Sequence, residues 1–252
     1  MNILINGIMG YMGREVYKLC ESGYLGAKFA AGVDLAVTES TELNYYSKIE
    51  EVDAEFLDCI IDFSHHTSTH SLLSFAVKNN LPVVLATTAH TKEEEVLIKQ
   101  ASSCIPVFYS ANMSLAVALL AKFIKKAVKF FPDAEIEIIE KHHSRKIDSP
   151  SGTALMLADA IQSVRKSSYT AYGRVGQKRR EKEEIGIHSV RCGSNVGEHE
   201  VIIATENQTI TFRHQAHSRA LFAEGAIVAA EFILKKEIGL YDMKNLIKER
   251  EF

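Results

Sequence analysis

The chain opens with a short apolar run that leads directly into a glycine-rich turn, and this feature most constrains the fold. Residues 2–6 are mostly apolar, as expected of a buried parallel strand. Gly7, Gly10 and Gly13 follow in a G-x-x-G-x-x-G spacing, and the apolar pattern beyond them is helical. A strand, a glycine turn and a helix place backbone N–H groups where a dinucleotide pyrophosphate binds, although many such turns hold no ligand. The opening therefore predicts a dinucleotide-binding unit.

An acidic residue closes the next predicted strand, where such a unit requires one. Asp34 follows the run 28–33, about 20 residues beyond the glycines. Its carboxylate is suited to accept hydrogen bonds from adenosine ribose hydroxyls and would repel a 2′-phosphate. The next residues, Leu35 and Ala36, supply no arginine for such a phosphate. The pattern favours NADH as the cofactor, with NADPH possible; a plain strand-end turn residue is the alternative for Asp34.

Strand-like and helix-like segments then alternate up to residue 109. Three apolar runs alternate with two helical patterns: 57–63, 67–79, 82–86, 91–102 and 105–109. This alternation predicts a doubly wound parallel sheet, in which ligands bind at the carboxyl ends of the strands. Residues 36–55 lack periodicity and are interpreted as a loop with a short helix. Polar or small residues at the strand ends are expected to form the rim of the cofactor site: Asp34, Ser64, Thr87, Thr88, Ala111 and Asn112.

The second half of the chain has a different pattern. A long amphipathic helix is predicted over 114–129, followed by a half-exposed strand over 134–141. Three further strands are predicted at 187–191, 198–205 and 209–217. Asn207 and Gln208 are expected to form the turn between the last two strands. The charged stretch 166–186 is interpreted as a solvated loop. Helices are expected at 219–234, packed back against the first domain, and at 238–247.

These elements predict an α/β protein with two domains. The first is a Rossmann-type doubly wound parallel sheet domain, residues 1–112 completed by 219–252, which binds the dinucleotide. The second, residues 113–218, is a smaller α+β domain with a roughly four-stranded mixed sheet, which binds the substrate.

A cluster of cations precedes a predicted helix start in the second domain. His142, His143, Arg145 and Lys146 fall within five residues, and Ser151 is a suitable N-cap for the helical pattern that follows. Free N–H groups at that helix start bind anions, and histidine and lysine are proton donors. The cluster predicts a substrate with carboxylates or phosphates. A solvated turn before an ordinary helix is the alternative.

Two motifs make the chain resemble the dihydrodipicolinate reductase family over essentially its whole length. The first is His142-His143-x-x-Lys146-x-Asp148-x-Pro150-Ser151-Gly152-Thr153-Ala154, and the second is Arg191-x-Gly193-x-x-x-Gly197-Glu198-His199. The resemblance implies reduction of 4-hydroxy-tetrahydrodipicolinate, a cyclic dicarboxylate, to tetrahydrodipicolinate in the diaminopimelate and lysine pathway. It also implies a homotetramer built through the second domain.

The resemblance assigns roles to particular residues. His142 is the expected acid/base residue and Lys146 a second proton donor, and which of them delivers the proton stays open. His143 and the backbone of Gly152 and Thr153 are expected to hold the substrate carboxylates. The cofactor is expected to contact Gly7, Ile8, Met9, Gly10, Tyr11, Met12, Asp34, Ala86, Thr87, Thr88, Ser110, Ala111, Asn112 and Met113.

The sequence departs from the family at two places. Tyr11 stands where members often carry an arginine that can meet a 2′-phosphate, which strengthens the preference for NADH. The family's Gly-Thr-Thr-Gly is replaced by Ala86-Thr87-Thr88-Ala89. The two added methyl groups are expected to shift cofactor binding slightly without abolishing function.

Composition excludes several other classes. The net charge of −3 argues against nucleic-acid binding, and the four widely spread cysteines form no metal or disulfide pattern. The chain has no apolar run of membrane-spanning length and no signal-peptide pattern, so a cytoplasmic protein is expected. Two alternatives remain: another two-domain dehydrogenase, of the aspartate or inositol type, and a non-catalytic NAD(H)-sensing module.

Overall fold

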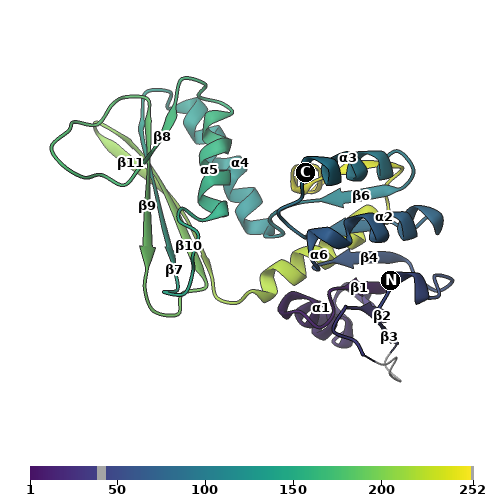
Figure 1. Ribbon diagram of the computed structural model, residues 1–252. Coiled ribbons are helices and arrows are strands. Elements are labelled where there is room, and N and C mark those ends of the chain that lie inside the picture. Colours follow the sequence, from purple (N-terminus) through teal and green to yellow (C-terminus); the bar gives the residue numbers. More distant parts are fainter. Residues whose placement is uncertain (39–43, 251–252) are drawn as a thin grey trace. The chain divides into compact units, whose positions relative to one another are not determined.

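The computed structural model describes residues 1–38 and 44–250, and the chain divides into two compact units (Figure 1). The first unit contains residues 1–114 and 219–252, and the second contains residues 115–218. Among the described residues, every helix is too short or too polar to span a membrane.

The first unit is built on a sheet of seven parallel strands. Its order is β12-β6-β5-β4-β1-β2-β3. The strands are β1 (Asn2–Asn6), β2 (Lys28–Val33), β3 (Tyr45–Tyr46), β4 (Cys59–Asp62), β5 (Val83–Leu85), β6 (Pro106–Tyr109) and β12 (Gly239–Tyr241). Because the chain adds strands first on one side of β1 and then on the other, the order reverses between β1 and β4. A Rossmann-type sheet binds its ligand at this point of reversal, and the predicted doubly wound parallel sheet is confirmed.

Helices cover both faces of this sheet. They are α1 (Tyr11–Glu21), α2 (Thr69–Lys78), α3 (Lys92–Ala101), α6 (Ala220–Ile233) and α7 (Met243–Glu249), with short 3₁₀ turns η1 (Tyr24–Gly26), η2 (Ile49–Glu51) and η3 (His66–Ser68). Strand side chains alternate between the two faces. Leu4 and Leu85 pack in one cluster with α2 and α3. On the other face Phe108 meets Phe232 of α6, with ring centroids 6.0 Å apart.

Two predictions for the first unit need correction. The stretch 238–247 is not one helix, because residues 239–241 form strand β12 beside β6 and Asp242 then caps α7 with a hydrogen bond from the Asn245 amide. The stretch 36–55 contains strand β3 as well as the 3₁₀ turn η2. Its residues 39–43 lie outside the described part of the chain.

The second unit is a mixed sheet with two helices on one face. The sheet order is β11-β10-β7-β9-β8. Its strands are β7 (Glu135–His142), β8 (Tyr169–Tyr172), β9 (Glu184–Arg191), β10 (Gly197–Thr205) and β11 (Gln208–Ala216). The helices α4 (Leu115–Phe130) and α5 (Gly152–Gln162) lie side by side in Figure 1. Ile136 and Ile138 of β7 pack in one core with Ile124 of α4 and Leu157 of α5.

The mixed sheet is confirmed, but it has one strand more than predicted. Residues 169–172 form strand β8, which pairs in parallel with β9 inside the stretch interpreted as a solvated loop. Tyrosine and threonine favour strands. This short segment was not predicted because it lies within a stretch of charged residues, which is typical of a loop. The turn between β10 and β11 lies at Glu206 and Asn207, one residue earlier than predicted.

Candidate active site

The glycine turn of the first unit brings backbone amides to the start of α1. Gly7 has φ +87°, a conformation that favours glycine, and its amide donates to the Val33 carbonyl at 2.8 Å. A β-carbon at Gly13 would lie 2.1 Å from the Gly7 carbonyl oxygen, so the turn and the helix touch through backbone alone. No described side chain caps α1 at Gly10, and the first turn carries no acidic residue. This cradle fits the pyrophosphate of a dinucleotide.

Asp34 lies directly beside this turn. One carboxylate oxygen accepts a hydrogen bond from the Met9 amide at 3.0 Å, and the other accepts one from the Ala36 amide, also at 3.0 Å. The predicted acidic residue and the predicted glycine turn are therefore in contact, although 25 residues separate them along the chain. Tyr11 is exposed at the helix start, and the guanidinium of Arg219 lies over its ring, 5.6 Å from the ring centre.

A buried polar network joins the ends of β1 and β4 at the point of strand reversal. The Asn6 amide donates to Asp62 at 2.9 Å and to the Ser64 hydroxyl at 3.0 Å, and that hydroxyl donates to Asp62 at 2.5 Å. Burial raises the pKa of the Asp62 carboxyl, against the opposing hydrogen bonds from Ser64 and Asn6. Sequence reasoning assigned no role to Asn6 or Asp62. The signal was present, because each is a polar residue at the end of a run of apolar residues.

The remaining predicted cofactor residues follow β5 and β6 at the same edge of the sheet. The amides of Ala86 and Ser110 donate to carbonyls of β4 and β5, which fixes where each loop leaves the sheet. Thr87 is buried at 5% exposure. Ala89, where the resemblance led us to expect a glycine, has φ +65°. This is the left-handed region that glycine adopts readily and alanine adopts at a cost.

The 110–113 segment is packed more tightly than a free loop. The Ser110 hydroxyl donates to the Asn112 carbonyl at 2.8 Å, and Met113 is 2% exposed. A β-carbon at Gly225 of α6 would lie 1.8 Å from the Met113 carbonyl oxygen. The side chain of Met113 is thus part of the core. Only the backbone around Met113 is available to a ligand.

In the second unit, strand β7 carries His142 at its end and the buried Glu140 two residues earlier. Nδ1 of His142 lies 2.5 Å from Oε2 of Glu140. Burial lowers the pKa of His142, and the hydrogen bond to Glu140 opposes that shift. Burial by itself raises the pKa of Glu140, but hydrogen bonds, first among them those from Arg191, outweigh it and bring the value to about 2. At neutral pH the ionised carboxylate of Glu140 is therefore in contact with a neutral His142 ring.

Arg191 and the start of α5 complete this cluster. Arg191 donates to both oxygens of Glu140, at 2.8 and 2.6 Å, and to the Asp148 carbonyl at 2.7 Å. Ser151 caps α5 as predicted, since its hydroxyl accepts from the Ala154 amide at 3.2 Å. The same hydroxyl lies 2.9 Å from Nε2 of His199. Burial lowers the pKa of His199 to about 4, so this second imidazole is neutral as well.

The predicted substrate residues surround this cluster. The Lys146 ammonium donates to the Asp148 carboxylate at 2.7 Å, and the Lys146 amide donates to the His143 carbonyl at 3.1 Å. His143 lies just beyond the end of β7 and is half-buried, whereas His142 is buried. A β-carbon at Gly152 would meet nothing within 4 Å, so the first residue of α5 borders open space.

Sequence reasoning missed Glu140 and gave no role to Arg191 or His199. The signal for Glu140 was its position, because the period-two pattern puts it on the same face of β7 as the core residue Ile138 and as His142. A carboxylate on an apolar face requires a partner. The cation that pairs with Glu140 could not be identified from the local sequence, since Arg191 is 51 residues away.

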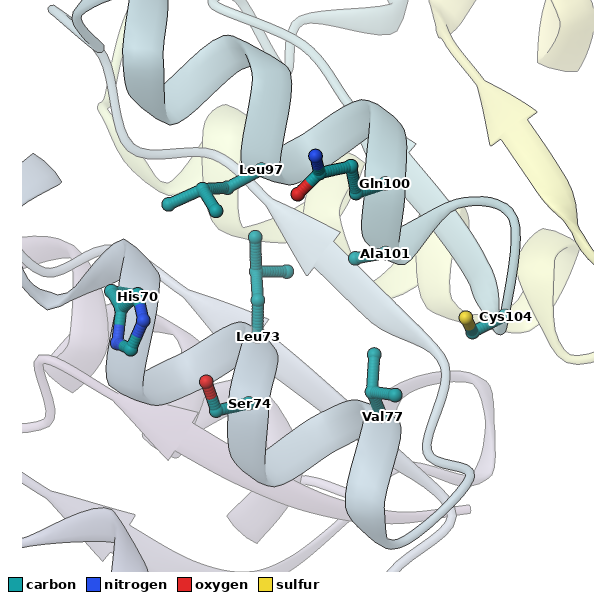
Figure 2. Close-up of a pocket in the computed structure, with 8 residues that line it drawn as sticks. All are labelled: His70, Leu73, Ser74, Val77, Leu97, Gln100, Ala101 and Cys104. Atoms are coloured by element: carbon teal, nitrogen blue, oxygen red, sulfur yellow. The ribbon is translucent and has the colours of Figure 1, made fainter.

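A hollow of about 250 Å³ in the first unit lies elsewhere, between α2 and α3 (Figure 2). Its described lining is mainly apolar and contains no lysine, arginine or carboxylate: His70, Leu73, Ser74, Val77, Leu97, Gln100, Ala101 and Cys104. Nothing in this lining matches a dicarboxylate or a dinucleotide, so the hollow is not part of the candidate site.

The parallel sheet with its glycine cradle, and the mixed sheet that carries the histidine and lysine cluster, define a pyridine-nucleotide-dependent oxidoreductase. The family model for the N-terminus of dihydrodipicolinate reductase matches residues 1–113, and the model for the C-terminus matches residues 116–247. The chain belongs to the dihydrodipicolinate reductase family.

Individual relatives agree with this assignment. The chain is 44% identical to the 4-hydroxy-tetrahydrodipicolinate reductase of Caldanaerobacter subterraneus subsp. tengcongensis, over 99% of both chains. It is 42% identical to that of Clostridium novyi, over 98% of both chains. In fold it is similar to the dipicolinate-bound dihydrodipicolinate reductase from Paenisporosarcina sp. TG-14, with a TM-score of 0.79 and 23% identity over 96% of this chain and 97% of the other. The family assignment favours the reductase over the dehydrogenase and sensor alternatives.

Proposed function

We propose that this protein reduces 4-hydroxy-tetrahydrodipicolinate to tetrahydrodipicolinate with a reduced nicotinamide cofactor, a step of the diaminopimelate route to lysine. The observation that carries the proposal is the cluster at the end of β7, where Glu140 contacts both His142 and the Ser151 amide just before α5, and Lys146 lies in the following loop. Membership of the family supports the proposal, because the relatives described above are named 4-hydroxy-tetrahydrodipicolinate reductase.

The cofactor residues are those at the carboxyl edge of the parallel sheet. The amides at 7–12 would hold the pyrophosphate, Asp34 the adenosine ribose, and 86–88 with 110–113 the nicotinamide half. When bound, the cofactor supplies a hydride to the substrate ring. Asp34 and Tyr11 favour NADH, because the carboxylate repels a 2′-phosphate and Tyr11 offers no charge to meet one.

The substrate is a cyclic dicarboxylate, and the second unit has the complementary groups. The amides of Gly152 and Thr153 at the start of α5 favour one carboxylate, and His143 and Lys146 provide further donors. A carboxylate that displaces Asp148 from the Lys146 ammonium would exchange one ion pair for another. The substrate can therefore be held without leaving the lysine charge uncompensated.

A proton must reach the substrate after reduction, and two groups can supply it. His142 is neutral when the site is empty, because burial lowers its pKa. Two substrate carboxylates beside the ring would raise that pKa and favour its protonated form. The Lys146 side chain is a second donor in the same cluster, so either group can serve as the acid. The site residues in these roles, and assembly as a homotetramer, are part of the proposal.

A coupled assay tests the function. The substrate is generated in situ by a separate synthase from pyruvate and aspartate semialdehyde, and loss of reduced-nicotinamide absorbance is followed with NADH and NADPH in parallel. We expect oxidation that depends on the synthase and is faster with NADH. Folded protein that binds NADH but oxidises neither cofactor would contradict the proposal. Light scattering on the same sample tests the tetramer.

A further inference from the structure

We propose that Glu140 is a positioning residue that fixes the proton of His142 on Nδ1 and sets the distance between that ring and the start of α5. The inference rests on the proposed function, in which His142 meets the substrate, and adds a residue to it. Glu140 itself acts only through its neighbours, because it is completely buried.

The contacts of Glu140 determine which nitrogen of His142 carries hydrogen. A carboxylate paired with a guanidinium is an acceptor only, and here Oε2 lies 2.5 Å from Nδ1. Nδ1 must therefore be the N–H of the neutral ring. Nε2 is left with its lone pair, or with the transferable proton when the ring is charged.

Space beside Nε2 supports the same assignment. Gly197 of β10 faces this nitrogen, and a β-carbon there would lie 3.0 Å from it, tighter than an ordinary contact. Gly197 is the first residue of β10 and pairs with Ala216 of β11, and its φ is not in the left-handed region, so its backbone conformation does not require glycine. Because Gly197 has no side chain, the space beside Nε2 on this side is not filled.

The two oxygens of Glu140 join two parts of the site. Oε2 contacts His142, while Oε1 accepts from the Ser151 amide at 3.1 Å, immediately before the helix start that would bind a substrate carboxylate. Arg191 donates to both oxygens and to the Asp148 carbonyl, so the carboxylate cannot rotate away. One buried group thus fixes the acid/base ring and the anion-binding amides relative to each other.

The other charged or titratable groups that face His142 do not replace Glu140. Arg191 of β9 and Lys146 of the following loop are cations, which disfavour a charged ring. His199 of β10 packs edge-on against His142, with ring centroids 5.2 Å apart, and is itself neutral. Among the described residues, Glu140 is the only anion in contact with the His142 ring. It is therefore the only one of these groups that favours protonation of His142.

Nitrogen-detected NMR of the unmodified protein gives the first test, independent of activity. We expect the neutral ring of His142, assigned by comparison with His142→Ala, to carry its proton on Nδ1. A ring protonated on Nε2 in the free enzyme would overturn the proposal, even if the protein proves to be the expected reductase. If it shows no reductase activity, the tautomer still decides the role of Glu140.

Substitution gives the second test. Glu140→Gln keeps the size of the side chain and removes the charge, so we expect kcat to fall about 10–100-fold, as it does when the partner that orients a metal-binding histidine is lost. KM should change far less. The pKa of His142 followed by NMR should fall. The alkaline limb of the kcat/KM profile, where a general acid loses its proton, should therefore move to lower pH. Unchanged tautomer, pKa and kcat in a folded variant would overturn the proposal.

A matched control separates positioning from general destabilisation. Glu198 is also a buried carboxylate of this sheet, paired with Lys141 and Arg213, and lies one strand away. Glu198→Gln should leave kcat within about threefold, with the pH profile unchanged. If Glu140→Gln fails to fold, Gly197→Ala tests Nε2 instead, because its methyl group covers that nitrogen and leaves Glu140 intact. Full activity of folded Gly197→Ala would contradict the assignment.

Discussion

Gly13 lies so close to Gly7 that a β-carbon at Gly13 would be 2.1 Å from the carbonyl oxygen of Gly7. The neighbouring atom belongs to the backbone, so no side chain can move to make room. Helix α1 can approach β1 this closely only because residue 13 has no side chain. The position of the amides at the start of α1 depends on that approach.

We therefore expect Gly13→Ala to weaken NADH binding at least about tenfold and to lower the free energy of unfolding by about 1–3 kcal/mol, as overpacking does. Fluorescence titration and urea denaturation measure the two effects. Lys18→Ala, on the exposed side of the same helix, is the control and should change neither. Normal NADH affinity in a folded Gly13→Ala protein would show that the turn does not bind the cofactor.

Asp34 is expected to determine the choice of cofactor. Asp34→Asn removes the charge and keeps an oxygen that can accept from Met9, so the ratio of kcat/KM for NADPH over NADH should rise about tenfold, which corresponds to about 1.4 kcal/mol of relieved repulsion. Asp34→Ala should shift the ratio similarly and also weaken NADH binding, because it loses the contact with the turn. Steady-state kinetics with both cofactors measure the ratio. An unchanged ratio in both variants would mean that Asp34 only supports the turn.

The extent to which the sequence predicted this structure depends on the range of the interactions involved. The glycine turn, the Ser151 cap and the helix predicted over 91–102 are local patterns, and each is present where the sequence places it to within one residue. A hydrogen bond that closes within a few residues leaves its signature within those residues. Strand β8 has no such signature, since four residues become a strand only because β9 lies beside them.

The site follows the same rule. His142 and Lys146 could be selected from one short stretch because their chemistry is unusual there. The ionised state of Glu140 depends on Arg191, a residue of another strand, and burial of the pair depends on the core beneath β7. Which residues titrate, and in which direction, therefore required the tertiary structure. The positive φ of Ala89 could not be predicted either, because no residue pattern indicates a positive φ at an alanine.

Lys146 should contribute both to binding and to turnover. Lys146→Ala removes a cation that can hold a substrate carboxylate and donate a proton, so we expect kcat/KM to fall by about 10²–10⁴-fold, with KM raised and kcat lowered. Lys182→Ala is a suitable control, since Lys182 also pairs with an aspartate, Asp133, but on an exposed surface. The coupled assay measures both variants. A kcat/KM for Lys146→Ala within about twofold of the unmodified protein would refute the role given to the lysine.

His199 should make the protein sensitive to acid. Its pKa is lowered by burial from the usual 6.5 to about 4, so the unfolded chain binds a proton at a pH where the folded one does not. The neutral His199 ring therefore contributes its full share to the free energy of unfolding above about pH 6.5. That contribution falls as the pH drops toward 4, by about 1.4 kcal/mol per pH unit at most and roughly 3 kcal/mol in all.

His199→Gln removes this titration and keeps a group that can hydrogen-bond to Ser151. At pH 7.5 the variant should be less stable than the unmodified protein, because the ring it replaces is packed in the core of the site. Between about pH 6.5 and 4 the difference should shrink and can reverse, since only the unmodified protein carries the cost of a buried imidazole. His70→Gln, at an exposed histidine of α2, should show a constant difference. Urea denaturation across this pH range measures all three proteins, and parallel curves for His199→Gln and the unmodified protein would mean that folding does not lower the pKa of His199.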